Sequence, residues 1–213
     1  MAAFDFKKEY KDIYFPKNEP SIINIPEMKY IMVDGKGDPN TSESYTKAVE
    51  VLYGLSYTIK MSEKGSSIPE GYFDYVVPPL EGLWWFEDIE FQGVIKGLKD
   101  KFSWTMMIRQ PEFVTEEVFD STKKALAKKK PDLDTSIARL EYFTEGLCAQ
   151  IMHIGSYDDE VPTVEKLEAY IREKGYHTCM SGQRQHHEIY LNDPRVTNPE
   201  KLKTVIRHPI VEL

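Results

Sequence analysis

The chain has 213 residues, of which 41% are hydrophobic, 29% charged and 12% aromatic, so it can bury a sizeable core and has an ordinary globular composition. Its formal net charge of −8 argues against nucleic acid as the main partner, because binding to phosphates needs a basic surface. No apolar run approaches the roughly 18 residues of a membrane span, no signal peptide is evident, and two cysteines without metal-binding spacing indicate a reduced, cytoplasmic protein.

The first half of the chain predicts an irregular arm followed by a strand, a helix and further strands. Three prolines punctuate residues 1–26, and Met28–Val33 is an apolar strand that ends in a glycine-containing turn. Thr41 or Ser42 can cap a helix whose apolar side chains, from Tyr45 to Ile59, follow helical spacing. Strands are then predicted over Tyr72–Val77, Leu83–Phe86 and Phe102–Arg109.

The second half predicts a similar order after a connecting helix. Thr115 caps that helix, which runs to about Lys129 with acidic residues in its first turn and lysines in its last. The remaining predicted elements are strands at Leu140–Phe143 and Leu147–Ile154, a helix from Pro162 with Gly175 as its C-terminal cap, a strand that contains Glu188, and a strand at Lys203–Arg207.

The strand-helix-strand-strand order therefore occurs twice, over Met28–Pro111 and Leu147–Pro209. Both copies end alike, in Ile-Arg-Gln-Pro (108–111) and Ile-Arg-His-Pro (206–209), and this agreement indicates an internal duplication. We expect an α+β fold in a single domain, 1–213, made of two strand-helix-strand-strand (SHS2) units, about 22–111 and 140–211, joined by a connecting helix at about 112–130. A pseudo-twofold axis between the units would leave a ligand cleft at their junction.

The strand around Glu188 carries the candidate functional residues. Side chains alternate between the faces of a strand, so His186, Glu188 and Tyr190 share one face, while His187 and Ile189 share the other. A carboxylate is costly to bury without a partner; Glu188 therefore either faces solvent or an arginine, or lies at the bottom of a ligand pocket. The adjacent histidines point in opposite directions, so we expect no metal site.

Other polar residues have simpler interpretations. His153 lies on a predicted strand and is typical of a hydrogen-bonded structural histidine. The acidic run Asp158-Asp159-Glu160 is typical of a solvated loop that leads into a helix. Cys148 and Cys179 lack a neighbouring base and are interpreted as small apolar residues rather than nucleophiles.

Several motifs occur in an order that is typical of one family. The stretches are Pro79–Trp85, Trp104–Pro111, Glu145–Glu160 and His186–Arg195. On these motifs the chain, over roughly residues 20–211, resembles the GyrI-like small-molecule-binding family, and in particular its stand-alone bacterial members. The resemblance implies a duplicated fold and a pocket with aromatic walls around a buried glutamate, which falls on Glu188.

The resemblance also implies a function. Some stand-alone relatives hydrolyse the strained cyclopropane of hydrophobic DNA-alkylating natural products, which gives detoxification without a cofactor. In that case Glu188 would act on the attacking water, and Tyr190 and His186 would help to bind the substrate. Trp85 rather than Trp84, together with Trp104, would sandwich a flat aromatic substrate.

Two other functions remain open at this stage. The chain could be a non-catalytic protein that sequesters lipophilic or cationic drugs, with Glu188 as the counter-charge. It could also inhibit gyrase, as some family members do. Under the first two hypotheses the partner is a hydrophobic aromatic small molecule, and under the third it is a protein. None of the three hypotheses involves nucleic acid or a membrane.

Overall fold

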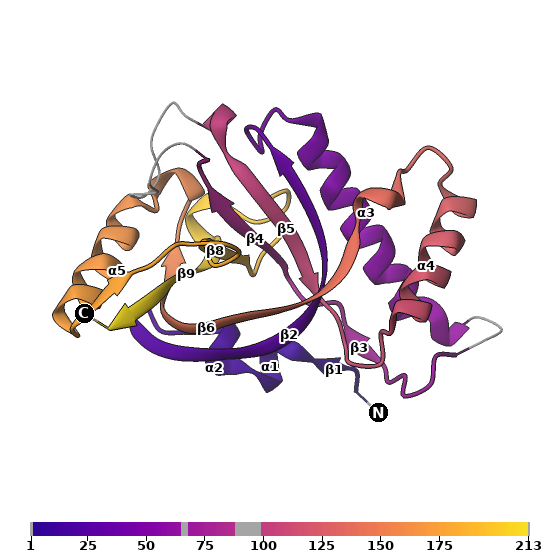
Figure 1. Ribbon diagram of the computed structural model, residues 1–213, viewed down its shortest axis with the longest axis horizontal. Coiled ribbons are helices and arrows are strands. Elements are labelled where there is room, and N and C mark those ends of the chain that lie inside the picture. Colours follow the sequence, from indigo (N-terminus) through magenta and orange to yellow (C-terminus); the bar gives the residue numbers. More distant parts are fainter. Residues whose placement is uncertain (1, 65–67, 88–98, 213) are drawn as a thin grey trace.

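An antiparallel barrel forms the centre of the molecule in the computed structural model, which describes residues 2–64, 68–87 and 99–212 (Figure 1). The strand order is β6-β2-β5-β4-β8-β9, and β6 also pairs with β9, which closes the sheet. A short strand, β7, extends the far end of β9. Closure removes the unpaired edges that an open sheet would expose.

The first half of the chain supplies three barrel strands and the helices beside them. Its elements are β1 (Phe4–Asp5), α1 (Phe6–Glu9), α2 (Lys11–Tyr14), β2 (Ser21–Lys36), α3 (Glu43–Lys60), η1 (Met61–Lys64), β3 (Tyr75–Val76), β4 (Leu80–Trp85), η2 (Lys99–Lys101), β5 (Ser103–Arg109) and α4 (Glu116–Lys129). The predicted caps are confirmed, since Ser42 accepts from the backbone N–H of Tyr45 and Thr115 from that of Val118.

The second half supplies the other three strands. Its elements are η3 (Thr135–Ile137), β6 (Arg139–Ile154), η4 (Tyr157–Asp159), α5 (Val161–Glu173), β7 (Tyr176–Thr178), β8 (His186–Tyr190), η5 (Pro199–Lys201) and β9 (Lys203–Glu212). Gly175 follows α5 with φ = +80°, a left-handed conformation that favours glycine after a helix. The predicted C-terminal cap is therefore confirmed.

Two long strands differ from the prediction. Strand β2 begins at Ser21, inside the segment predicted to be irregular, and β6 is one continuous strand rather than two. The two strands pair with each other along part of their length. Beyond that part, β2 pairs with β5 and β6 pairs with β9. Pro26 lies within β2 without ending it, although proline lacks the backbone N–H that a ladder bond needs. The strand predicted at Tyr72–Val77 is only two residues long.

Helices cover the outer face of the barrel wall. Helices α3 and α5 pack on the outer face, where their apolar residues meet residues such as Ile31 and Ile206. The two helices lie on either side of the central strands β4 and β8 (Figure 1). The helix α4 packs on α3 rather than on the sheet. None of the helices in the described residues is long and apolar enough to cross a membrane.

The two halves share one topology. In the first half β2 pairs with β5 and β5 with β4; in the second, β6 pairs with β9 and β9 with β8. The matching tetrapeptides therefore fall on the equivalent strands β5 and β9, where Arg109 and Arg207 are both buried. This shared order supports a duplication, which stays a hypothesis about the origin of the fold.

Candidate functional site

A cavity of about 740 Å³ lies on the outer face of the barrel, over β4 and β8 and between α3 and the start of α5. Its aromatic lining consists of Tyr45, Tyr53, Trp84, Phe102, Tyr157 and Tyr190. Its polar lining includes His186, Glu188 and Glu160. The volume and the apolar walls with a few polar groups are typical of small-molecule sites.

Glu188 lies in this cavity, as one of the two interpretations of the sequence predicts. It pairs with Gly82 of β4 and with Ile206 of β9 across the sheet, so strand geometry directs its side chain to the helix-covered face. The side chain is 12% exposed, and its Oε1 is 3.1 Å from Nε2 of His186, which is buried. The strand prediction that His186, Glu188 and Tyr190 share one face is confirmed.

Trp84 forms the wall of the cavity beside Glu188. Its indole lies over Gly82, where an added Cβ would be 2.7 Å from the indole Nε1. Glycine at this position therefore lets the ring lie close to the sheet. The indole N–H donates to the hydroxyl of Tyr190 over 3.0 Å. Burial and the charge of Glu188 hold the pKa of Tyr190 well above its usual value, so this hydroxyl keeps its proton and can donate it to an acceptor in the cavity.

The choice of Trp85 over Trp84 is wrong. Trp85 lies on the opposite face of β4, where it lines a second cavity of about 440 Å³ at the mouth of the barrel. Pairing of Trp84 with His186 across β4 and β8 puts Trp84 on the Glu188 face. All six residues of β4 are buried or half-buried, so burial on both faces leaves no alternation that could distinguish the two tryptophans.

Trp104 shares the face of Glu188, but it is completely buried and is not part of the cavity lining. It packs edge-on against Tyr45, with ring centroids 5.4 Å apart, and Tyr45 in turn stacks on Trp84 at 6.1 Å. Tyr45 therefore lines the cavity, and Trp104, for which direct contact with the ligand was predicted, does not. Trp104 supports Tyr45 from behind.

Glu160 is a cavity residue that the sequence did not reveal. The interpretation of this acidic run as solvated is wrong for Glu160, which is 2% exposed and whose Oε2 has no hydrogen-bond partner among the described residues. Burial and the neighbouring charge of Glu188 raise the pKa of Glu160 to about 10, so the side chain is a neutral carboxylic acid at neutral pH. Its place in the family motif Glu145–Glu160 could have indicated a role in the site, whereas the residues next to it could not.

Glu160, His186 and Glu188 offer three atoms within 4.8 Å of one another, a spacing that a divalent cation could occupy. His186 and Glu188 are already hydrogen-bonded to each other in this arrangement. Absence of a metal stays a prediction.

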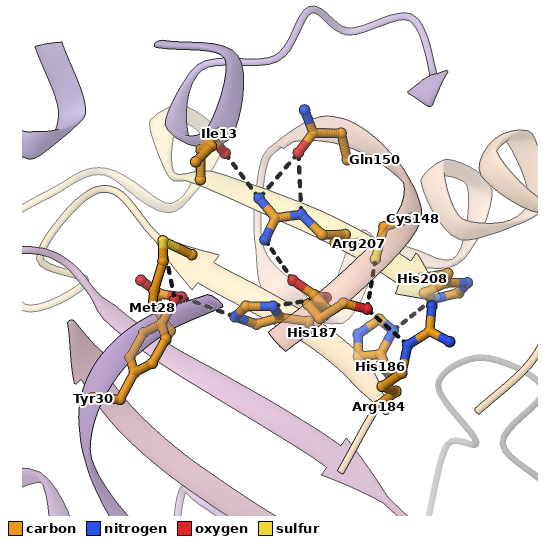
Figure 2. A network of polar contacts seen from close by, with 12 residues as sticks. Ile13, Met28, Tyr30, Cys148, Gln150, Arg184, His186, His187, Arg207 and His208 are labelled. Atoms are coloured by element: carbon orange, nitrogen blue, oxygen red, sulfur yellow. Dashed lines mark hydrogen bonds and ion pairs between the residues drawn. The ribbon is translucent and has the colours of Figure 1, made fainter. Parts of the chain in front are cut away.

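His187 has a separate, structural environment inside the barrel, since adjacent strand residues point to opposite faces. Its Nδ1 is 3.0 Å from Glu145 and its Nε2 is 3.1 Å from Glu81. Arg207 donates to the other oxygen of Glu145 over 2.8 Å. Figure 2 shows His187 and Arg207 in this network and His186 outside it, beside His208. The four side chains that form it are each 2% exposed or less.

Opposite charges in this interior network hold each other ionised. Although burial acts in the other direction, Glu145 and Glu81 raise the pKa of His187 to about 9. Likewise, despite burial, His187 and Arg207 lower the pKa of Glu145 to about 2. The network fixes β8 from the interior side and takes no part in the cavity.

His153, predicted to be a structural histidine, is buried, and its ring nitrogens lie 2.9 Å from the Thr163 hydroxyl and 3.0 Å from the Ser156 carbonyl. Cys148 is buried and Cys179 is partly exposed. Neither cysteine lines the cavity.

A closed barrel with an aromatic cavity around a buried carboxylate defines a small-molecule-binding protein. The chain belongs to the GyrI-like small molecule binding domain family, whose sequence profile matches residues 18–211. It is similar to a protein from Listeria innocua described as a hydrolase, with 48% identity and a TM-score of 0.88 over 98% of this chain and all of that one. An uncharacterized conserved protein from the same organism has 49% identity and a TM-score of 0.90, and the match again covers 98% of this chain and all of that one.

The fold also occurs in a distant protein. The C-terminal domain of EcmrR has 9% identity and a TM-score of 0.55, and the match covers 92% of this chain and 98% of that domain. At this identity the similarity shows the fold alone. A search among curated proteins found no match.

Proposed function

We propose that the protein is a hydrolase that opens the activated cyclopropane of hydrophobic, DNA-alkylating aromatic compounds with water and so detoxifies them. The observation that carries this proposal is the position of Glu188, a carboxylate at the bottom of an aromatic cavity with an imidazole on one oxygen. The similarity to a protein described as a hydrolase, at 48% identity over nearly the whole chain, supports it.

The cavity residues divide the reaction between binding and proton transfer. Trp84 and Tyr45 hold the flat ring system, exclude bulk water and bring the strained ring close to Glu188. Glu188 takes a proton from water while the water oxygen bonds to the cyclopropane carbon. The C–C bond that breaks leaves its electron pair on the conjugated ring, whose oxygen takes a proton from solvent as the product leaves the cavity. Ring strain supplies the driving force, so no cofactor is needed.

The direct test is incubation with a spirocyclopropyl-dienone, followed by mass spectrometry for the water adduct. In Glu188→Gln the rate should fall by roughly 10²–10⁴-fold, the usual contribution of a general base. Binding of a neutral, unreactive analogue should be retained, because the aromatic walls supply most of its affinity. A wild-type rate in Glu188→Gln would remove Glu188 from the mechanism.

A second candidate function is sequestration of lipophilic or cationic drugs without turnover. The observation that favours it is the pair of carboxyl groups, Glu160 and Glu188, within an aromatic cavity, since aromatic faces and a carboxylate both attract cations. If this function is the correct one, Glu188→Gln should weaken binding of cationic ligands and leave any slow hydrolysis unchanged. The same mutant therefore distinguishes the two functions.

A further inference from the structure

A continuous chain of hydrogen bonds connects Glu188 to the surface of α5. Nε2 of His186 is 3.1 Å from Glu188, and Nδ1 of His186 is 2.7 Å from Nε2 of His208. Nδ1 of His208 is 2.6 Å from Oε1 of Glu168. Both imidazoles are 1% exposed, whereas the Glu168 side chain is 25% exposed. The contact between the two histidines is visible in Figure 2.

The outer end of this chain fixes the positions of the ring protons. Although burial acts in the other direction, the hydrogen bond from His208 lowers the pKa of Glu168, so Glu168 is a carboxylate. Burial lowers the pKa of His208, so this ring is neutral. A neutral ring has one N–H. His208 therefore donates from Nδ1 to Glu168 and accepts at Nε2 from Nδ1 of His186.

The inner end of the chain then contains one shared proton. If Nδ1 of His186 donates to His208, Nε2 of His186 faces Oε1 of Glu188. Two lone pairs cannot form a hydrogen bond, so a proton lies between these atoms, on one or the other. Oε2 of Glu188 is not part of the contact with His186 and can accept a hydrogen bond or a proton from the side of Tyr190 and the cavity. This arrangement follows from the distances and from the donor count of each group.

We propose that His186, His208 and Glu168 form a proton relay that carries a proton from Glu188 to solvent as Glu188 accepts one from water. This inference rests on the proposed function. When a water proton binds to Oε2, the shared proton goes to Nε2 of His186, the Nδ1 proton of His186 goes to Nε2 of His208, and the Nδ1 proton of His208 goes to Glu168. Glu168 releases it to solvent. One proton enters at Oε2 and one leaves from Glu168. With the shared proton starting on Oε1 of Glu188, Glu188 ends protonated on Oε2, and each neutral histidine ends as its other tautomer. When the product leaves and solvent enters the cavity, Oε2 loses its proton there and the transfers run in reverse from Glu168, which restores the starting tautomers.

The relay explains how Glu188 can accept a proton from water at Oε2 while a ligand fills the cavity, because its Oε1 proton leaves toward His186. A bound ring system excludes solvent from the inner side, so a proton cannot leave by that route. Among the described residues, the charged and titratable groups that face the relay are Glu160, Tyr45, Tyr157 and Tyr190 around Glu188, Glu145 near His208, and Arg172 beside Glu168. His186 and His208 are positioning residues in this scheme, since they act through Glu188.

The test uses Glu168→Gln, which retains an oxygen for His208 but cannot take up a proton. We expect kcat for the spirocyclopropyl-dienone to fall by about 10- to 100-fold, less than the loss of the direct base, with unchanged affinity for the unreactive analogue. The solvent isotope effect should indicate several protons in transit in the wild type and fewer in the variant. Glu165→Gln, on an exposed position of the same helix, is the matched control and should behave as the wild type.

A second measurement does not depend on turnover. The ¹⁵N shifts of the imidazoles should show His208 as the Nδ1–H tautomer in both wild type and Glu168→Gln. An Nε2–H tautomer would overturn the relay even if the protein hydrolyses its substrate. A wild-type rate in Glu168→Gln, or equal losses of rate and analogue affinity, would also overturn it. Correct tautomers in a wild type that does not hydrolyse the dienone would refute the proposed function and, with it, the role of the relay in turnover.

Discussion

Glu145→Gln tests whether the interior network stabilises the barrel. In the native state Glu145 bonds to both His187 and Arg207. Its pKa is about 2 in place of 4.5, and since one pKa unit corresponds to about 1.4 kcal/mol, the shift is worth on the order of 3 kcal/mol. Removing one partner of a buried ion pair typically costs about 3–5 kcal/mol. We therefore expect Glu145→Gln to lower the free energy of unfolding by about 3 kcal/mol at pH 6.

The pH dependence gives a second, sharper expectation. The contribution of Glu145 is complete above its unfolded pKa of 4.5 and is lost as the pH falls toward 2. The contribution of His187 is complete below its unfolded pKa of 6.5 and is lost as the pH rises through 9. Both describe the same contact, so they are not added. The wild type should be most stable between these limits, and its advantage over Glu145→Gln should narrow above pH 6.5.

Urea unfolding followed by circular dichroism, at several pH values from 5 to 9.5, measures both effects. The matched control is Glu141→Gln on the same strand, β6. Glu141 pairs with Arg139, and their side chains are 33% and 38% exposed, so its loss should cost at most about 1 kcal/mol. A difference between wild type and Glu145→Gln that stays constant across this pH range, or one below about 1 kcal/mol, would refute the reasoning.

Three further predictions concern the cavity. Trp84→Ala should weaken binding of flat aromatic ligands by about 1–3 kcal/mol in calorimetry, whereas Trp85→Ala, on the opposite face, should leave the affinity unchanged; equal effects would contradict the assignment of Trp84. Glu160→Gln should raise the unfolding temperature at pH 8 but not at pH 4, because the raised pKa of about 10 means that the stability present below 4.5 is lost progressively as the pH rises toward 10. Treatment with a chelator should leave the rate of turnover unchanged, because we expect no metal site. If the chelator instead abolished turnover and added zinc or manganese restored it, a metal site would be established.

Local sequence rules predicted the elements that depend on local interactions. The caps at Ser42 and Thr115 and the glycine after α5 follow from backbone groups that must be satisfied within a few residues. The alternation along β8 likewise determined which neighbours Glu188 has on its own strand. These predictions needed no knowledge of partners elsewhere in the chain.

The composition of the site could not be predicted in this way. Trp84 and Trp85 are both suitable for an apolar environment. Trp84 has one in the cavity, and Trp85 has one at the mouth of the barrel. The choice depends on register with β8, which is fixed about 100 residues further along the chain. Glu160 is similar, since its burial results from packing near β8 and not from the polar residues beside it.

Closure of the barrel was also beyond local rules. Strands β2 and β6 are long because each one leaves its first neighbour and joins a second. The prolines near the start of β2 favoured an irregular segment, and Pro209 lies inside β9, beyond the predicted end of that strand. Tertiary pairing overrides both signals, because a strand tolerates proline wherever the backbone N–H has no partner to bind.

His187 and Glu188 are adjacent on β8 but lie in different electrostatic environments, one inside the barrel and the other in the outer cavity. Inside the barrel, Glu81 and Glu145 lie against His187 and Arg207, and each of these four buried side chains has an ion-pair partner within the network. On the outer side, two carboxyl groups share the cavity with an imidazole, and Oε2 of Glu160 is buried without a hydrogen-bond partner among the described residues. The interior network can therefore hold β8 rigid while the outer groups remain free to change protonation, which is the division that a general base in an aromatic cavity needs.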